Sequence, residues 1–150
     1  MKTVAVLLAL SVLICFGLAA AENTAADKLQ ALIVREQGKN VKKSTGIYAY
    51  NCFTDDDLAR FRESKRAEKI VEGLRTDPEF KAIVSALADM PERARAEVLA
   101  KARKIAMPTF AMVGYVDPSG KSQTDAGRSA QLDISVAICD AVQAAVSGGK

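Results

Sequence analysis

The feature that most constrains the fold of this chain is a helical spacing of apolar residues that prolines interrupt. Through the middle of the chain, apolar positions recur at intervals of three and four residues, which places them on one face of an α-helix. Proline fits the first turn of a helix but not its interior. Pro78 and Pro91 therefore predict two helix starts, and Pro108 predicts an end. We expect several short helices here rather than one long one.

The segment before these prolines carries a further break. Asp55, Asp56 and Asp57 suit the first turn of a helix, where free N–H groups and the helix dipole favour carboxylates. They lack the alternating positions, the central glycine and the distal glutamate of a calcium-binding loop. The apolar spacing then stops at Ser64 and resumes at Ala67. This pattern predicts either a kinked helix or two short helices joined near Ser64.

Helices are also expected on both sides of this central region. The spacing predicts one from Ala25 to Gln37, with Gly38 as its stop, and a last one from about Asp125 to Ala145. The apolar surface of the last helix is too wide for a single neighbour, so we place this helix centrally. The expected fold is all-α. It is one domain over 22–150, a compact bundle of about five or six helices with one long central C-terminal helix.

Residues 1–21 have the pattern of a secretory signal peptide. Lys2 gives a positive start, an almost wholly apolar run follows, and Ala19 to Ala21 are the small residues that a signal peptidase requires. The apolar run is at the lower limit for a membrane-spanning helix, so an uncleaved anchor is the alternative. We expect cleavage, a secreted or periplasmic protein, and no stable membrane insertion of the mature chain.

The cysteines predict a covalent tie. Signal cleavage would remove Cys15 and leave Cys52 and Cys139. Two cysteines in an oxidising compartment most simply pair, so we expect a structural disulfide between the Cys52 segment and the last helix. A redox role usually needs closer cysteines, as in Cys-x-x-Cys, and a structural zinc needs four ligands. We expect neither a metal nor a cofactor.

The chain contains no histidine, and this absence excludes several chemistries. Ser-His-Asp and Cys-His catalysis and histidine-bound metal or haem are impossible. The balance of 21 Lys and Arg against 18 Asp and Glu is too even to predict nucleic-acid binding. Lys39, Lys42 and Lys43 form the net-basic cluster, which would suit an acidic partner or a lipid headgroup. A solvated loop is the simpler interpretation.

Two carboxylates on the last helix are the remaining acid–base candidates. Asp133 and Asp140 are two helical turns apart and so share a face. Such a pair can serve acid–base chemistry where a cleft holds it. No partner group lies nearby in the sequence, so we favour a solvated interpretation.

Aromatic side chains define a possible partner or ligand surface. Most of them fall in two segments without helical spacing, one beside Cys52 and one after Pro108. If the segments meet, they would form a surface for a protein partner or an apolar ligand, made of Tyr48, Tyr50, Phe53, Phe110, Met112 and Tyr115. If these side chains are buried, they anchor the two segments instead, and this is the interpretation that we favour.

These patterns favour a non-enzymatic binding protein outside the cytoplasm, with an unknown protein partner or a small apolar ligand. An inhibitor or immunity protein for an exported enzyme is one form of this function. A carrier with an apolar pocket between helices is the second class, and a carboxylate-dependent enzyme is the third. An exposed aromatic patch would favour the partner, and an enclosed cavity the carrier. A cleft where Asp133 and Asp140 meet another acid would favour the enzyme.

Overall fold

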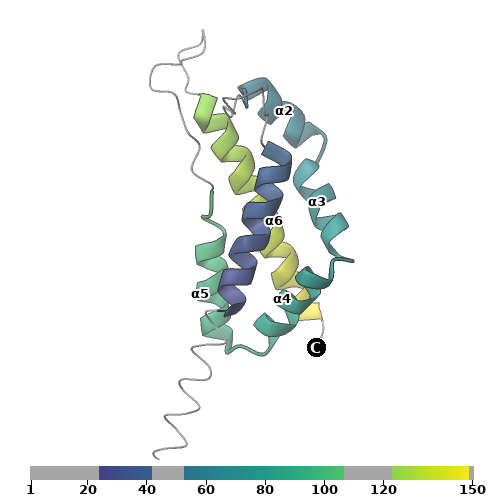
Figure 1. Ribbon diagram of the computed structural model, residues 1–150, viewed down its shortest axis with the longest axis vertical. Coiled ribbons are helices and arrows are strands. Elements are labelled where there is room, and N and C mark those ends of the chain that lie inside the picture. Colours follow the sequence, from purple (N-terminus) through teal and green to yellow (C-terminus); the bar gives the residue numbers. More distant parts are fainter. Residues whose placement is uncertain (1–23, 42–52, 107–122, 149–150) are drawn as a thin grey trace, which may run out of the picture.

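The computed structural model describes residues 24–41, 53–106 and 123–148 (Figure 1). These residues form six helices and no strand, so the predicted all-α class is confirmed for the described part of the chain. The first helix spans 24–41. The others are α2 (Asp55–Glu63), α3 (Arg66–Leu74), α4 (Pro78–Ala88), α5 (Glu92–Ala102) and α6 (Gln123–Gly148). The predicted signal peptide, residues 1–21, lies outside the described residues.

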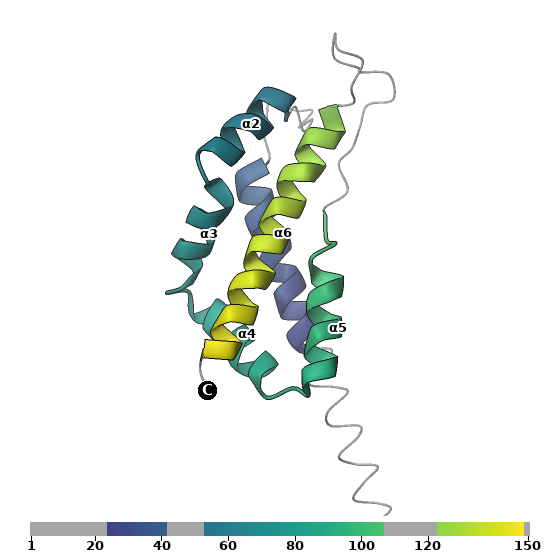
Figure 2. The same ribbon diagram turned by 180° about the vertical axis from the view of Figure 1, so that it is seen from behind.

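The helix α6 is the central element of the bundle. It spans 26 residues and contacts α2, α3, α4 and α5. In Figure 1 the 24–41 helix, drawn in purple and blue, crosses in front of α6. Figure 2 shows α6 along the opposite side, with α3 on one flank and α5 on the other. Neighbours on several sides account for the wide apolar surface that the sequence of α6 carries.

The hydrophobic core lies between the 24–41 helix, α6 and the shorter helices. The side chains with almost no exposed surface come from these elements at helical spacing: Leu29, Leu32, Ile33, Ile83, Leu87, Leu99, Ile134, Ile138 and Val142. Burial of such side chains is the main favourable contribution to folding, at about 1.5–3 kcal/mol for each fully buried aliphatic group.

A buried polar contact fixes the 24–41 helix against α6. The Nε2 of Gln37 donates to Ser135 Oγ (2.8 Å) and to the backbone oxygens of Gln131 (3.0 Å) and Ile105 (2.8 Å). Gln37 is fully buried, and a buried amide destabilises the fold unless it is hydrogen-bonded. These bonds therefore select one rotational setting of the first helix. Among the described residues, the buried Gln131 Oε1 has no hydrogen-bond partner.

Local capping chemistry sets two helix starts. At α2, Thr54 Oγ1 accepts from the Asp57 N–H (3.2 Å), and the Asp57 carboxylate accepts from the Thr54 N–H (3.1 Å), which forms a capping box. At α4, Asp77 Oδ1 accepts from the Glu79 N–H (2.8 Å), with Pro78 in the first turn. The predicted starts at Asp55 and Pro78 are confirmed.

The predicted break near Ser64 is also confirmed, as two separate helices. α2 ends at Glu63 and α3 begins at Arg66. Between them Lys65 adopts the left-handed backbone conformation, with φ 50° and ψ 46°. A residue with a Cβ loses about 1–2 kcal/mol in this conformation, so the packing of α3 must hold the joint in place.

The predicted stop at Gly38 is wrong. The first helix continues to Val41, whose side chain is almost wholly buried. Asn40 Nδ2 donates to the backbone oxygen of Glu36 (2.8 Å) near this end. Glycine costs a helix about 1 kcal/mol relative to alanine, and burying Val41 offsets that cost.

The predicted Cys52–Cys139 disulfide is not found. Among the described residues, Cys139 is a free cysteine in the core, and no cysteine pair lies at disulfide distance. Cys52 itself lies outside the described residues. Burial raises the pKa of the Cys139 thiol to about 11, which keeps it protonated and unreactive.

Candidate functional site, the groove between α3 and α6

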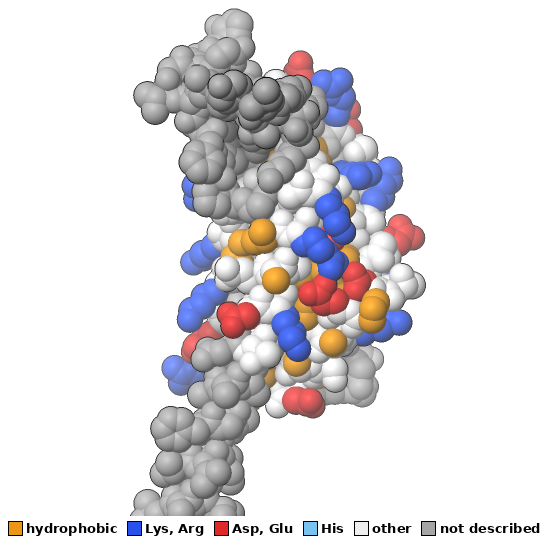
Figure 3. Space-filling view, in the orientation of Figure 1, with side chains coloured by type: hydrophobic (Ala, Val, Ile, Leu, Met, Phe, Trp, Pro, Cys, Tyr) orange, Lys and Arg blue, Asp and Glu red, His pale blue; other side chains and the backbone are white. Residues whose placement is uncertain are grey.

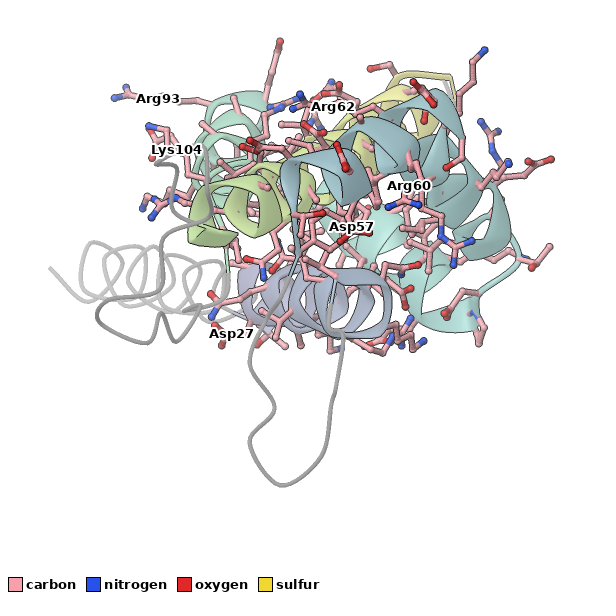
Figure 4. The ribbon with its side chains drawn as sticks, turned by 90° about the horizontal axis from the view of Figure 1, so that it is seen from above. Asp27, Asp57, Arg60, Arg62, Arg93 and Lys104 are labelled. Carbon is pink, nitrogen blue, oxygen red and sulfur yellow. The ribbon has the colours of Figure 1, made fainter. Side chains whose placement is uncertain are left out.

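A groove of about 980 Å³ runs between α3 and α6. We call it the α3–α6 groove. It is lined by Phe61, Arg62, Ala67, Glu68, Val71, Glu72, Arg75, Asp133, Val136, Ala137, Asp140 and Ala141. Figure 2 views the molecule from the side where these two helices flank each other. Seen from above in Figure 4, Arg62 lies on the side of the bundle opposite the 24–41 helix and its Asp27.

The shape of the groove follows from helical spacing. On each wall the lining residues recur at intervals of one and three or four residues, which is one continuous stripe of a helix. The stripe on α6 extends from Asp133 to Ala141, about 12 Å at 1.5 Å per residue. The groove is therefore a trough about two helical turns long, not a pocket around a single point.

The floor of the groove is apolar. Phe61 and Val71 are buried beneath it, and Ala137 and Ala141 are half-buried. Val136 is 41% exposed, and among the described residues it is the one large hydrophobic side chain that is exposed. Alanines on α6 keep the wall low, so that a second apolar surface can approach the helix closely.

The rim of the groove is charged and predominantly acidic. Four carboxylates line it, from Glu68 and Glu72 on α3 and from Asp133 and Asp140 on α6, against the two guanidinium groups of Arg62 and Arg75. Within the described residues, Glu68 and Glu72 form no ion pair. The α3 side of the rim therefore presents two carboxylates to solvent.

Asp133 and Asp140 share the groove, as their spacing predicts, but each is bound to a different arginine. Arg62 donates to both oxygens of Asp133 (Nε 2.8 Å, Nη2 3.3 Å), and Arg103 Nη2 donates to Asp140 (2.8 Å). The hydrogen bond to Asp133, together with its charge, raises the pKa of Arg62. Each of the two carboxylates therefore already has an arginine partner.

The aromatic surface expected from the sequence is described only at Phe53. Tyr48, Tyr50, Phe110, Met112 and Tyr115 lie outside the described residues. Phe53 is 6% exposed, so it is an anchor and not part of a surface. Its ring meets that of Phe61 edge-on, with centroids 6.3 Å apart and an interplanar angle of 75°. Phe53 thus supports the groove from beneath, through Phe61.

Two further observations limit the chemistry of the described residues. No group of three or more Cys, Asp or Glu side chains among them could hold a metal ion. None of the helices in these ranges combines the length and apolarity needed to cross a bilayer. The chain matches no protein-family model and has no significant similarity to a curated protein or a solved structure.

Proposed function

We propose that this chain is an exported, non-enzymatic binding protein whose α3–α6 groove holds an amphipathic helical segment of a protein partner. The single observation that carries the proposal is the apolar trough with an acidic rim. Helix-in-groove recognition uses this shape, with apolar anchors one and two turns apart. The occupant has leucine-type anchors facing the floor and lysine or arginine residues at its edges. An inhibitor or immunity protein for an exported enzyme would be one form of this function.

Charge favours a protein segment over a small apolar ligand. A carrier site surrounds its ligand with apolar walls, whereas four carboxylates border this groove. Glu68 and Glu72 would remain solvated beside a helix with basic edges and would attract it. The ion pairs of Asp133 and Asp140 argue against acid–base catalysis at the same place.

A peptide titration tests the proposal. The probe is a synthetic amphipathic peptide of about four helical turns, with leucines on one face and lysines at the edges. We expect saturable binding that Val136→Lys weakens by about tenfold or more, because it places a charge in the apolar floor. Ala96→Lys is the matched control, since Ala96 is exposed on α5, on the flank of α6 opposite α3 (Figure 2), and it should retain wild-type affinity.

Three outcomes would overturn parts of the proposal. If both variants lose peptide affinity equally, the groove is not the binding site. Equal affinity for a peptide with glutamates at the edges would remove the charge preference. Saturable binding of Nile red in the groove with no peptide binding would assign a carrier instead.

A further inference from the structure

A second hollow lies on the opposite face of α3, between α3 and the 24–41 helix. Its volume is about 430 Å³, and we call it the Arg66 hollow. Its lining is mainly polar. It holds four cationic side chains, Arg35, Lys39, Arg66 and Lys69, and two carboxylates, Glu36 and Asp77. Figure 3 shows this side of the molecule, where basic and acidic side chains gather together.

The acids of the hollow are already bound to Arg35. Its Nε donates to Glu36 (2.9 Å), one terminal nitrogen donates to Asp77 (2.9 Å), and the other reaches Glu79. Burial alone would lower the pKa of Arg35, but the bonds to Glu36 and Asp77 and the charge of Glu79 outweigh it and raise the pKa. Arg35 and its three carboxylates therefore form one hydrogen-bonded cluster with an excess of negative charge, part of which Lys39 neutralises through Glu36.

Arg66 and Lys69, the two cations of the hollow on α3, have no carboxylate partner among the described residues. Lys69 forms no ion pair within the described residues. Arg66 uses its Nε to donate to Asn40 Oδ1 (3.0 Å), a neutral oxygen. Arg66 and Lys69 are one turn apart on α3, and Lys39 is on the facing helix, where it bonds to Glu36 (3.0 Å). Arg66 and Lys69 are thus two like charges on one wall of the hollow without a carboxylate partner, and an anion between them would reduce their repulsion.

The Arg66 guanidinium is held in position before any ligand arrives. Asn40 receives its Nε bond, and Asn40 is itself held because its Nδ2 donates to the Glu36 backbone oxygen (2.8 Å). With Nε fixed, the two terminal nitrogens keep one direction. Planar, fixed N–H groups of this kind suit phosphate oxygens.

Gly73 supplies an independent observation. It lies within α3, one turn after Lys69, where glycine destabilises a helix relative to alanine. A Cβ at this position would meet no atom within 4 Å, so packing does not require the glycine. The missing side chain of Gly73 keeps the wall of the hollow open beside Arg66 and Lys69.

We propose that the Arg66 hollow binds a phosphate group, with Arg66 and Lys69 as its main ligands and Lys39 as a third cation. Charge-assisted bonds from a guanidinium and an ammonium, one helical turn apart, match an oxyanion with several acceptor oxygens. Free phosphate and the phosphate of an anionic lipid headgroup share this chemistry. This site is separate from the α3–α6 groove, and the two proposals stand or fail independently.

The first test is a titration of the full chain with inorganic phosphate, in which amide chemical shifts measured by NMR report binding. We expect saturable shifts at residues 39–40 and 66–73. The double variant Arg66→Gln/Lys69→Gln should weaken binding by about tenfold or more, since each change removes a charge-assisted bond. The control Lys81→Gln/Arg128→Gln removes the same charge from exposed sites away from the hollow and should bind as the wild type does.

Vesicle binding distinguishes the two sources of the phosphate. Vesicles of phosphatidylcholine with phosphatidic acid, compared with phosphatidylcholine alone, should bind through the hollow only if a lipid headgroup is a ligand. Free phosphate should compete for that binding. Gly73→Ala separates a binding role from a structural one, because we expect it to raise the Tm while weakening phosphate binding.

The proposal is overturned in three ways. Equal loss in the control variant would show a general effect of charge. Absence of saturation with both phosphate and the acidic vesicles would show that the hollow takes no phosphate. If Gly73→Ala and Arg66→Gln/Lys69→Gln both bind phosphate as tightly as the wild type does, the phosphate site is not on α3.

Discussion

The two faces of α3 border two different environments, although the helix has only nine residues. Toward the α3–α6 groove it presents Glu68 and Glu72 above an apolar floor. Toward the Arg66 hollow it presents Arg66 and Lys69 beside a polar cluster. Alternation of charge along the sequence of α3 thus becomes separation of charge in space, because residues three and four apart share a face. A mixed-charge helix in a sequence is therefore not always a uniform solvated surface.

The largest expected difference between the two faces lies in the apolar residues beneath them. Leu74, 4% exposed, lies under the hollow, and Val71, 9% exposed, lies under the groove. Leu74→Ala should reduce the free energy of unfolding by about 2–4 kcal/mol, through lost burial and an internal cavity. Val71→Ala removes less buried area and should cost about 1–2 kcal/mol. Urea unfolding measures both values. Equal costs would mean that the groove floor is packed as tightly as the core.

Cys139 reports whether the groove floor stays closed. The residue lies on α6 between Ala137 and Asp140 of the groove wall, but its side chain faces the core. Because burial raises its pKa to about 11, a thiol reagent at pH 8 should react about a hundredfold more slowly than with the urea-unfolded chain. Rapid reaction in native conditions would show that the groove opens to the core.

The same pKa predicts a loss of stability at alkaline pH. The unfolded thiol ionises at about 8.5, whereas the folded thiol stays protonated up to about 11. The folded state therefore binds more protons than the unfolded state between these two pH values. The contribution of the Cys139 thiol to stability is complete below the unfolded pKa and is lost as pH rises toward 11. Cys139→Ala should flatten the stability profile between pH 8 and pH 11.

Arginines on the two faces should differ in their contribution to stability. Arg35→Met removes one of the two cations bonded to Glu36, whose side chain is only 9% exposed, and should cost about 1–2 kcal/mol. Arg62→Met breaks an ion pair with Asp133 whose side chains are 56% and 32% exposed, and solvent screening limits the cost to below about 1 kcal/mol. Thermal unfolding at low and high salt compares them. A larger effect of Arg62→Met would mean that the groove rim holds the bundle together.

The smallest expected effect concerns the joint before α3. Lys65→Gly should raise the free energy of unfolding by less than about 1 kcal/mol, because relief of the left-handed backbone outweighs the greater freedom of the unfolded chain. Lys65→Ala, which keeps a Cβ, is the matched control and should give no gain. Peptide and phosphate affinities should stay unchanged in both variants. A change in either affinity would show that the joint sets the position of α3.

The features predicted correctly from the sequence depend on neighbouring residues. Asp77 and Pro78 begin α4 through capping and a fixed φ, and the break at Ser64 follows from lost apolar spacing. The predicted stop at Gly38 is wrong because burial of Val41, three residues later, favours continuation of the helix. The groove and the hollow were not predicted, because each joins helices far apart in the chain. Lys39 belonged to the predicted basic cluster, but its companions Arg66 and Lys69 come from α3.

The central position of α6 has a consequence for synthesis. A ribosome makes α6 after the other five described helices, yet α2, α3, α4 and α5 all pack on it. Until α6 emerges, these helices lack one of the two long helices that bury their apolar stripes, and short helices alone are only marginally stable in water. The nascent chain therefore stays loosely structured through most of its translation.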